Sequence, residues 1–498
     1  MSQKPNRRQR PTVPPADSGE MAAAYKPLLT EEEFKLLVNE INQPLPTAIR
    51  LNPLKAPPNL ASRLSEKYGW QLEAVPFCPA GYRVTIGAGP EVSAVLEHRL
   101  GLMYIQEAAS MLPPELFNFS PQREELVLDL AASPGGKTTH LISRLEDSGL
   151  VIANDSSQGR IQALRLVLQQ WGAANAAVSR FPGERFGEWF PSMFDKVLLD
   201  APCSMQGLRT AESHISRPVT EKESRQLSRR QLALLTSALR TLRVGGELVY
   251  STCTLLPQED EMVVEELLRV FGSAVEILDA QTKLPAPAPA ITSLDGAELH
   301  PALSKAIRLW PHRYHTAGFF ACHLRKIEHT PMRPTSPPSR PLAQVGFEEL
   351  TAREQRAFCE EFHNTYAYDL LADISSHQRT LVRHFEEMHL LPMLLLEKFP
   401  TLPLQSAGML LGQQTASGFL PSHQWASRFG ARCQRNIVQL DEIESRLWLS
   451  GADLLPRGSP AKETDRFRII LNQEGLSLGC GKVTQSALKN LFPRHLLL

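Results

Sequence analysis

Two cysteines in the middle of the chain stand where side chains could do chemistry. Cys203 follows the apolar run DKVLLD (195–200), and Cys253 follows GELVYST (246–252). Both runs predict buried strands of a parallel sheet, whose carboxyl ends surround the ligand site in open α/β folds. We therefore expect both thiols at one crevice, together with Asp200. One buried cysteine often acts only as a small hydrophobic residue, but two at the ends of neighbouring strands favour thiol chemistry.

A glycine-containing loop, LDLAASPGGKTTHL (128–141), precedes both cysteines. Its end, Gly136-Lys137-Thr138, is similar to a phosphate-binding loop, but that motif needs an earlier glycine where this chain has Ala131. A nucleoside triphosphatase is therefore the weaker interpretation. Small residues before a helix also suit a dinucleotide or S-adenosylmethionine, and Asp155 follows at the distance of about 20 residues expected for a ribose-binding acid. This pattern alone fits dehydrogenases, methyltransferases or a simple tight turn.

The alternation of apolar runs and amphipathic segments predicts the fold that positions these residues. Helical segments such as IQALRLVLQQW separate the apolar runs. We expect strands at 126–130, 150–154, 176–179, 195–200, 246–252, 274–278 and 318–324. Strands that alternate with helices in this way predict a Rossmann-like α/β domain with a mostly parallel, seven-stranded sheet.

The chain of 498 residues is too long for one ordinary core, so several domains are expected. The stretch EHTPMRPTSPPSRP reads as a stiff linker because it is rich in proline and serine. The predicted organisation is a disordered basic tail (1–20), an N-terminal α+β domain of RNA-binding type (21–120), the α/β domain (121–327), the Pro-rich linker (328–344), a C-terminal domain (345–445) and a small basic RNA-binding module (446–498).

Composition narrows the class of protein. Hydrophobic residues make up 42% of the chain, charged residues 21%, and the formal net charge is zero, so a polyanionic partner would have to be met by local basic patches. The seven cysteines include no CxxC pair, which argues against a disulfide framework and a zinc site and favours reduced thiols in the cytoplasm. No apolar run approaches the roughly 20 residues that span a bilayer. We expect a cytoplasmic monomer that holds no metal and does not bind membranes.

Three motifs, LDLAASPGGKT, LLDAPCS and VYSTCT, together resemble the cofactor loop and the two catalytic motifs of the Nop2/Sun family of RNA 5-methylcytosine methyltransferases. The stretches AIRLNPLK, YIQEAASMLP and RLWPHRYHTAGFFACHLRK extend the resemblance over roughly residues 45–326. The length and the C-terminal region look most like the bacterial small-subunit ribosomal RNA enzymes of the RsmF type. A transfer-RNA enzyme with the same chemistry, or a non-catalytic RNA-binding assembly factor with this fold, remains an alternative.

The resemblance implies S-adenosyl-L-methionine as the cofactor and assigns roles to individual residues. Cys253 would be the nucleophile that adds to cytosine, Cys203 would serve release of the product, and Asp200 would contact both base and cofactor. Asp155 would bind the ribose. The remaining cofactor contacts would come from Ala131, Ala132, Ser133, Pro134, Gly135, Gly136 and Lys137.

Two positions depart from the family pattern. Pro182 stands where the family commonly has an aspartate, and Met205 where it often has the first glycine of Gly-x-Gly. Proline offers neither a carboxylate nor an N–H group, so an adenine contact would have to come from elsewhere. Met205 could shape which cytosine enters the site.

The partner implied by the resemblance is RNA, with ribosomal RNA or the small ribosomal subunit as the favoured form. Arg50 matches a family position, and Arg209, Arg225 and Arg229 are expected to hold phosphates near the crevice. Arg225 and Arg229 lie in a helical segment, for which a merely solvated face is the alternative. The C-terminal region resembles the RNA-binding modules appended to this group of enzymes.

Overall fold

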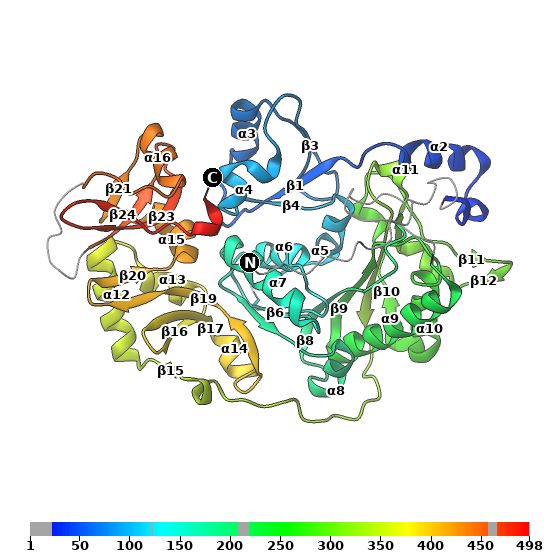
Figure 1. The fold of residues 1–498 in the computed structure, drawn as a ribbon. Coiled ribbons are helices and arrows are strands. Elements are labelled where there is room, and N and C mark those ends of the chain that lie inside the picture. Colours follow the sequence, from blue (N-terminus) through cyan, green and yellow to red (C-terminus); the bar gives the residue numbers. More distant parts are fainter. Residues whose placement is uncertain (1–21, 121–122, 208–218, 457–465, 498) are drawn as a thin grey trace, which may run out of the picture.

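The computed structural model describes residues 22–120, 123–207, 219–456 and 466–497 (Figure 1). The predicted tail (1–20) and Arg209 lie outside these residues. No helix in the described ranges is long and apolar enough to span a bilayer.

The central sheet carries the seven predicted strands. These are β5 (Leu126–Asp129), β6 (Leu150–Asn154), β7 (Ala176–Ser179), β8 (Phe194–Asp200), β9 (Leu242–Thr252), β10 (Val275–Ile277) and β14 (Phe319–Lys326). Their spatial order is β10-β14-β9-β8-β5-β6-β7, and the pairs from β9 to β7 are parallel. The predicted mostly parallel α/β sheet is confirmed, and β14 and β10 close one side as antiparallel strands.

Helices cover both faces of this sheet (Figure 1). The covering helices are α6 (Gly136–Arg144), α7 (Gln158–Trp171), α8 (Phe186–Trp189), α9 (Glu221–Thr241) and α10 (Glu261–Phe271). Side chains alternate along each strand, so Val127 joins the core with α6 and α7 while Leu128 joins the core with α9 and α10. Burial on both faces explains why these strands read as continuous apolar runs.

The N-terminal domain is a four-stranded antiparallel sheet with the order β2-β3-β1-β4. Its strands are β1 (Thr47–Leu51), β2 (Gln71–Ala74), β3 (Gly81–Thr85) and β4 (Met103–Ile105), and its helices are α2 (Glu31–Ile41), α3 (Leu60–Tyr68), α4 (Leu96–Arg99) and α5 (Leu112–Leu116). Short elements β11 (Ser293–Leu294), β12 (Ala297–Glu298), β13 (Ile307–Leu309) and α11 (Pro311–Tyr314) lie between β10 and β14 in the chain.

The C-terminal region contains two further sheets. The first consists of β15 (Phe347–Glu349), β16 (Arg379–His384), β17 (Glu387–Pro392), β19 (Met409–Thr415) and β20 (Gly418–Pro421), with helices α12 (Ala352–Tyr366), α13 (Leu370–Ser376), α14 (Met393–Lys398) and α15 (His423–Phe429). The second consists of β21 (Ile437–Gln439), β22 (Phe467–Leu471), β23 (Ser477–Val483) and β24 (Leu488–Asn490), with α16 (Glu442–Leu449). The boundary predicted at 445/446 falls inside α16 and between the paired strands β21 and β22, so the second sheet draws on both sides of it.

One strand from the C-terminal region joins the central sheet. β18 (Leu404–Ala407) pairs antiparallel with β7, and β13 pairs with β14, so the sheet has nine strands where seven were predicted. Without β18, β7 would present an unpaired edge, which proteins commonly cover. The four residues of β18, LQSA, are only partly buried. The strand therefore does not need an apolar run, and the sequence pattern did not predict it.

Buried ion pairs fasten the C-terminal region to the α/β domain. Asp147, which follows α6, lies 3.0 Å from Arg379 and also pairs with Arg428, and all three side chains are at least 90% buried. Arg428 donates a further hydrogen bond to the carbonyl of Gly172 at 2.7 Å. A buried charge of this kind destabilises the fold when its oppositely charged partner is removed.

We predict that Asp147→Asn lowers the apparent melting temperature by several degrees. The loss of one carboxylate leaves Arg379 and Arg428 as buried cations with weakened pairing, at a cost of about 3 kcal/mol. Asparagine tolerates the positive φ of 70° at this position, so the substitution tests charge and not backbone strain. Thermal unfolding with Glu442→Gln as control checks this, because Glu442 forms only an exposed pair with Arg446. Equal melting temperatures in both variants would contradict the prediction.

Candidate active site

The two predicted thiols meet at the carboxyl edge of the central sheet. In the parallel pair of β8 and β9, Asp200 lies opposite Ser251, so both chains leave the sheet side by side. Cys203 follows Asp200 by three residues and Cys253 follows Ser251 by two. Their Sγ atoms are 3.0 Å apart, and both residues are half-buried. A group that enters from solvent can therefore reach both thiols at one point.

The environment of the Cys203 thiol favours its protonated form. The pKa of Cys203 lies well above its ordinary value. The main cause is the hydrogen bond with Cys253 Sγ, and burial of the thiol is the second. Cys203 therefore keeps its proton at neutral pH. Met205 follows in the same loop with φ of 59°, the left-handed conformation that glycine adopts without strain. The departure from the family pattern at position 205 thus places a large side chain, 40% exposed, at a glycine-type backbone position.

Asp200 is held by two neighbours. Its carboxylate accepts hydrogen bonds from Lys137 Nζ at 2.7 Å and from Ser251 Oγ at 2.8 Å. Lys137 also donates to Ser110 Oγ at 2.8 Å. Burial lowers the pKa of Lys137, but the Asp200 carboxylate more than compensates and the net pKa lies above its usual value. Lys137 therefore remains an ammonium ion and holds the Asp200 side chain in place.

A cavity of about 200 Å³ lies beside Asp200 and fits the predicted cofactor loop. Its lining consists of Tyr104, Ile105, Gln106, Ser110, Asp129, Ala131, Ala132, Ser133, Pro134, Gly136, Lys137 and Asp200. Gly135 has φ of 115°, and a Cβ on Gly136 would lie 2.9 Å from the ring of Tyr104, so the loop needs both glycines. One Asp129 oxygen is buried and has no hydrogen-bond partner among the described residues. This unmet acceptor, the small-residue loop and the start of α6 suit a polar, nucleoside-containing cofactor.

Asp155 lies at the end of β6 but outside the residues that line the cavity. It is buried, its Oδ1 accepts the N–H of Ser157 at 2.8 Å, and its Oδ2 lies 3.3 Å from Arg160. A ribose contact by Asp155 therefore stays a prediction. Pro182 is exposed in the turn after β7.

Sequence reasoning missed Asn154, which precedes Asp155 and ties three strand ends together. Its Nδ2 donates to the carbonyls of Leu130 and Phe181 at 3.2 and 3.0 Å. Its Oδ1 accepts the N–H of Phe181 at 3.0 Å and the hydroxyl of Ser179 at 3.0 Å. The signal in the sequence was an amide at the end of a buried apolar strand, where an unpaired polar side chain would be costly.

Arg50 does not occupy the position expected for an RNA contact. It is fully buried, and its Nε donates to Gln106 Oε1 at 3.0 Å. Its Nη2 donates to the carbonyl of Gly136 and to Thr139 Oγ1, and the guanidinium stacks over Trp171. Burial lowers its pKa to about 10, so it stays charged. The structure corrects the expectation: Arg50 supports the wall of the cofactor cavity, because β1 packs against the start of α6.

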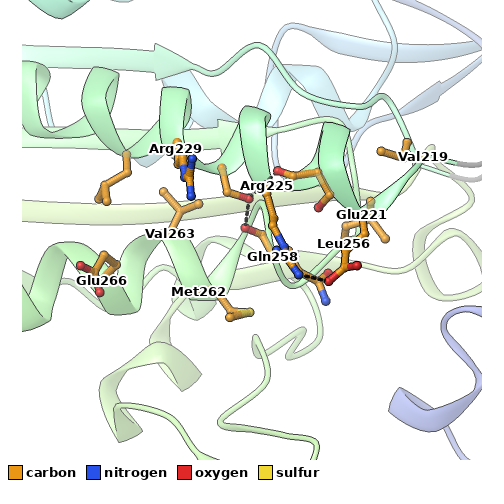
Figure 2. Close-up of a pocket in the computed structure, with 12 residues that line it drawn as sticks. Val219, Glu221, Arg225, Arg229, Leu256, Gln258, Met262, Val263 and Glu266 are labelled. Carbon is orange, nitrogen blue, oxygen red and sulfur yellow. Dashed lines mark hydrogen bonds and ion pairs between the residues drawn. The ribbon is translucent and has the colours of Figure 1, made fainter.

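Arg225 and Arg229 lie on α9 at a groove of about 660 Å³ beside the start of α10 (Figure 2). Arg225 is exposed and pairs with Glu221 one turn earlier. Arg229 is also exposed, and no ion pair to it is found among the described residues. The lining of the groove includes Leu256, three residues after Cys253. An RNA contact at these arginines stays a prediction.

The fold and the site define a class, the Rossmann-like methyltransferases. A cofactor loop follows β5, and the two thiols follow β8 and β9, which lie on one side of β5 in the sheet. Comparison with known proteins gives the particular family. A family model described as the N-terminal domain of 16S rRNA methyltransferase RsmF matches residues 19–108, and one described as 16S rRNA methyltransferase RsmB/F matches residues 116–325.

Relatives match over nearly their whole length. Ribosomal RNA small subunit methyltransferase F of Aeromonas salmonicida is 31% identical over 96% of this chain and 95% of its own. The protein of the same name from Klebsiella pneumoniae is 31% identical over 97% and 96%. A solved methyltransferase homologue from Pyrococcus horikoshii is 33% identical, with a TM-score of 0.53, over 62% of this chain and 99% of its own. The chain belongs to the RsmF family of S-adenosylmethionine-dependent methyltransferases, which confirms the resemblance seen in the sequence.

The buried Asp129 predicts a pH-dependent stability that Asp129→Asn removes. Burial raises the pKa of Asp129 to about 7. Between about pH 4 and pH 7 the folded protein keeps a proton that the unfolded chain has released, so this stabilisation is lost as the pH rises toward 7. Asparagine can still accept the Thr138 hydroxyl, which bonds Asp129 at 2.7 Å.

Thermal unfolding of both proteins, without cofactor, from pH 5 to pH 8 checks this prediction. The melting temperature of Asp129→Asn relative to the unsubstituted protein should increase from pH 5 to pH 7 and then level off. The change corresponds to about 2–3 kcal/mol. Parallel pH profiles would show that the Asp129 carboxyl titrates as it does in the unfolded chain.

Proposed function

We propose that this protein transfers a methyl group to carbon 5 of a cytosine in small-subunit ribosomal RNA, through a covalent adduct with Cys253. The observation that carries the proposal is the 3.0 Å approach of the two thiols beside Asp200, at the wall of the cofactor cavity. The named substrate of the relatives, small-subunit ribosomal RNA, supports the choice of RNA.

The proposed chemistry explains why a thiol is needed. Carbon 5 of cytosine is a poor nucleophile, and addition of the Cys253 thiolate to carbon 6 moves electron density onto carbon 5. When bound, S-adenosylmethionine supplies the electrophilic methyl group. As the thiolate adds, ring nitrogen 3 takes up a proton from solvent, which neutralises the negative charge that develops there. Asp200, oriented by Lys137 and Ser251, then accepts a hydrogen bond from this protonated nitrogen.

Release of the product needs a second group. The proton on carbon 5 must leave, its electron pair restores the double bond between carbons 5 and 6, and Cys253 departs as a thiolate. Cys203 is proposed for this step, because its sulfur lies 3.0 Å from that of Cys253. Cys203 first has to give its own proton to solvent, and its raised pKa then makes the thiolate a strong base for the carbon 5 proton.

The target cytosine has to be unpaired or rotated out of a helix to reach the two sulfur atoms. We include in the proposal that Arg225 and Arg229 hold neighbouring phosphates and that the two C-terminal sheets contribute to RNA binding. The proposal also comprises a monomer that works in the cytoplasm, where both thiols stay reduced.

Substitution of the two cysteines should give opposite results. Cys253→Ala should abolish both methylation and covalent capture of RNA, because the nucleophile is lost. Cys203→Ala should accumulate a protein–RNA adduct, because addition and methylation precede the impaired release. A denaturing gel with unmodified 16S rRNA or small ribosomal subunits, plus labelled cofactor, distinguishes the two. Cys359→Ala, a buried thiol of the C-terminal region, is the control and should behave as the unsubstituted enzyme. Unchanged turnover in both test variants would overturn the proposal.

Arg229→Ala should weaken RNA binding equally for different RNA sequences. Loss of one phosphate contact should also reduce the slope of log affinity against log salt by about 1. Binding measured at several salt concentrations checks this. Arg269→Ala is the matched control, because Arg269 is exposed on α10 but its guanidinium pairs with Glu266. An identical salt slope for both variants would argue that Arg229 lies on a merely solvated face.

A further inference from the structure

The loop that carries Cys203 is held on both sides by one buried pair of side chains. Glu259 Oε2 accepts the backbone N–H of Ser204 at 2.9 Å, just after Cys203. Gln231 Nε2 donates to the carbonyl of Pro202 at 3.0 Å, just before Cys203. The same Gln231 nitrogen donates to Glu259 Oε2 at 2.9 Å. The two peptide groups that flank the thiol are therefore fixed through a single carboxylate–amide contact.

Both members of the pair are fully buried. Gln231 comes from the middle of α9, and Glu259 lies between Cys253 and the start of α10. The hydroxyl of Tyr250 donates to the backbone carbonyl of Glu259 at 2.5 Å and so anchors that residue to β9. No ion pair to Glu259 is found in the part of the chain that the structure describes, and its second oxygen has no hydrogen-bond partner there. A buried carboxylate with so few partners is costly for folding, which points to a functional reason for its position.

The pair also links the two cysteine segments to each other. Ser204 Oγ donates to Thr254 Oγ1 at 3.2 Å, so the residues that follow Cys203 and Cys253 are in direct contact. Through Glu259, the Cys203 loop is tied to the chain that continues from Cys253. The separation of the two sulfur atoms is thus set by this buried network in addition to the strand pairing.

We infer that Glu259 and Gln231 are positioning residues for Cys203 and that they control release of the methylated RNA. The inference rests on the proposed function. No hydrogen bond from either side chain to the sulfur atoms is found among the described residues; both act through the backbone on either side of Cys203. Loss of Glu259 would free the Ser204 N–H and allow Cys203 to move away from Cys253, while β9, which ends just before Cys253, stays in the sheet.

The test compares release with the first methylation in the same protein. Glu259→Ala should make the covalent RNA adduct persist about tenfold longer on a denaturing gel, the effect of losing a hydrogen bond to a charged group. The first turnover of methyl transfer to unmodified 16S rRNA should stay within about twofold. Glu259→Gln keeps an oxygen acceptor for the Ser204 N–H, so it should restore release to within about threefold of the unsubstituted enzyme.

A double substitution and a control separate positioning from general destabilisation. If Glu259 acts only through Cys203, then Glu259→Ala should not slow release further when added to Cys203→Ala. Glu247→Ala is the control, because Glu247 is also a buried acid, on β9, and it bonds His323 and Lys196 away from the thiols. It should lower the melting temperature without changing adduct persistence relative to the first turnover.

The outcomes separate failure of the positioning inference from failure of the proposed function. If Cys203→Ala traps adduct and Glu259→Ala releases RNA at the normal rate, the positioning inference fails and the proposed function stands. Equal losses of first turnover and release in Glu259→Ala, or additive effects with Cys203→Ala, also overturn the inference. If Cys203→Ala itself traps no adduct, the proposed release role fails first, and the inference fails with it.

Discussion

The register of the parallel pair β8 and β9 is the constraint on which the active site depends. With Asp200 opposite Ser251, the two chains leave the sheet together and bring their sulfur atoms to 3.0 Å. A slip by one residue would turn every side chain of one strand to the other face, which the apolar cores on both sides resist. The packing of the sheet therefore fixes the register that brings the two thiols together at its carboxyl edge.

Around this edge, charge is balanced within short distances. Lys137 pairs with Asp200, whereas no ion pair to Asp129 is found among the described residues, and burial raises the pKa of Asp129 to about 7. The cavity thus holds one ion-paired acid, Asp200, and one carboxyl, that of Asp129, that can be neutral at physiological pH. Such a pair offers hydrogen-bond acceptors to a polar cofactor with little net negative charge beside the two thiols.

The modules of the chain are structurally interdependent. The N-terminal domain supplies Tyr104, Gln106 and Ser110 to the cofactor cavity, and Arg50 bonds that wall to α6. The last sheet shares a core with the N-terminal sheet, and β18 extends the central sheet. RNA-binding surfaces on the outer modules would therefore be held at fixed positions relative to the two thiols, as placing one cytosine at a single point requires.

The sequence by itself determined the central strands, the loop after β5 and the place of both cysteines at strand tips. These features follow from local periodicity and from short motifs, in which neighbouring residues carry the signal. Tertiary structure alone decided that Arg50 is buried, that β18 completes the sheet and that Glu259 holds the Cys203 loop. Each depends on contacts between distant segments: Arg50 and Thr139 are 89 positions apart, and Ser204 and Glu259 are 55. A polar residue in a sequence does not reveal its partner, because the same side chain is stable in water or in a paired, buried site.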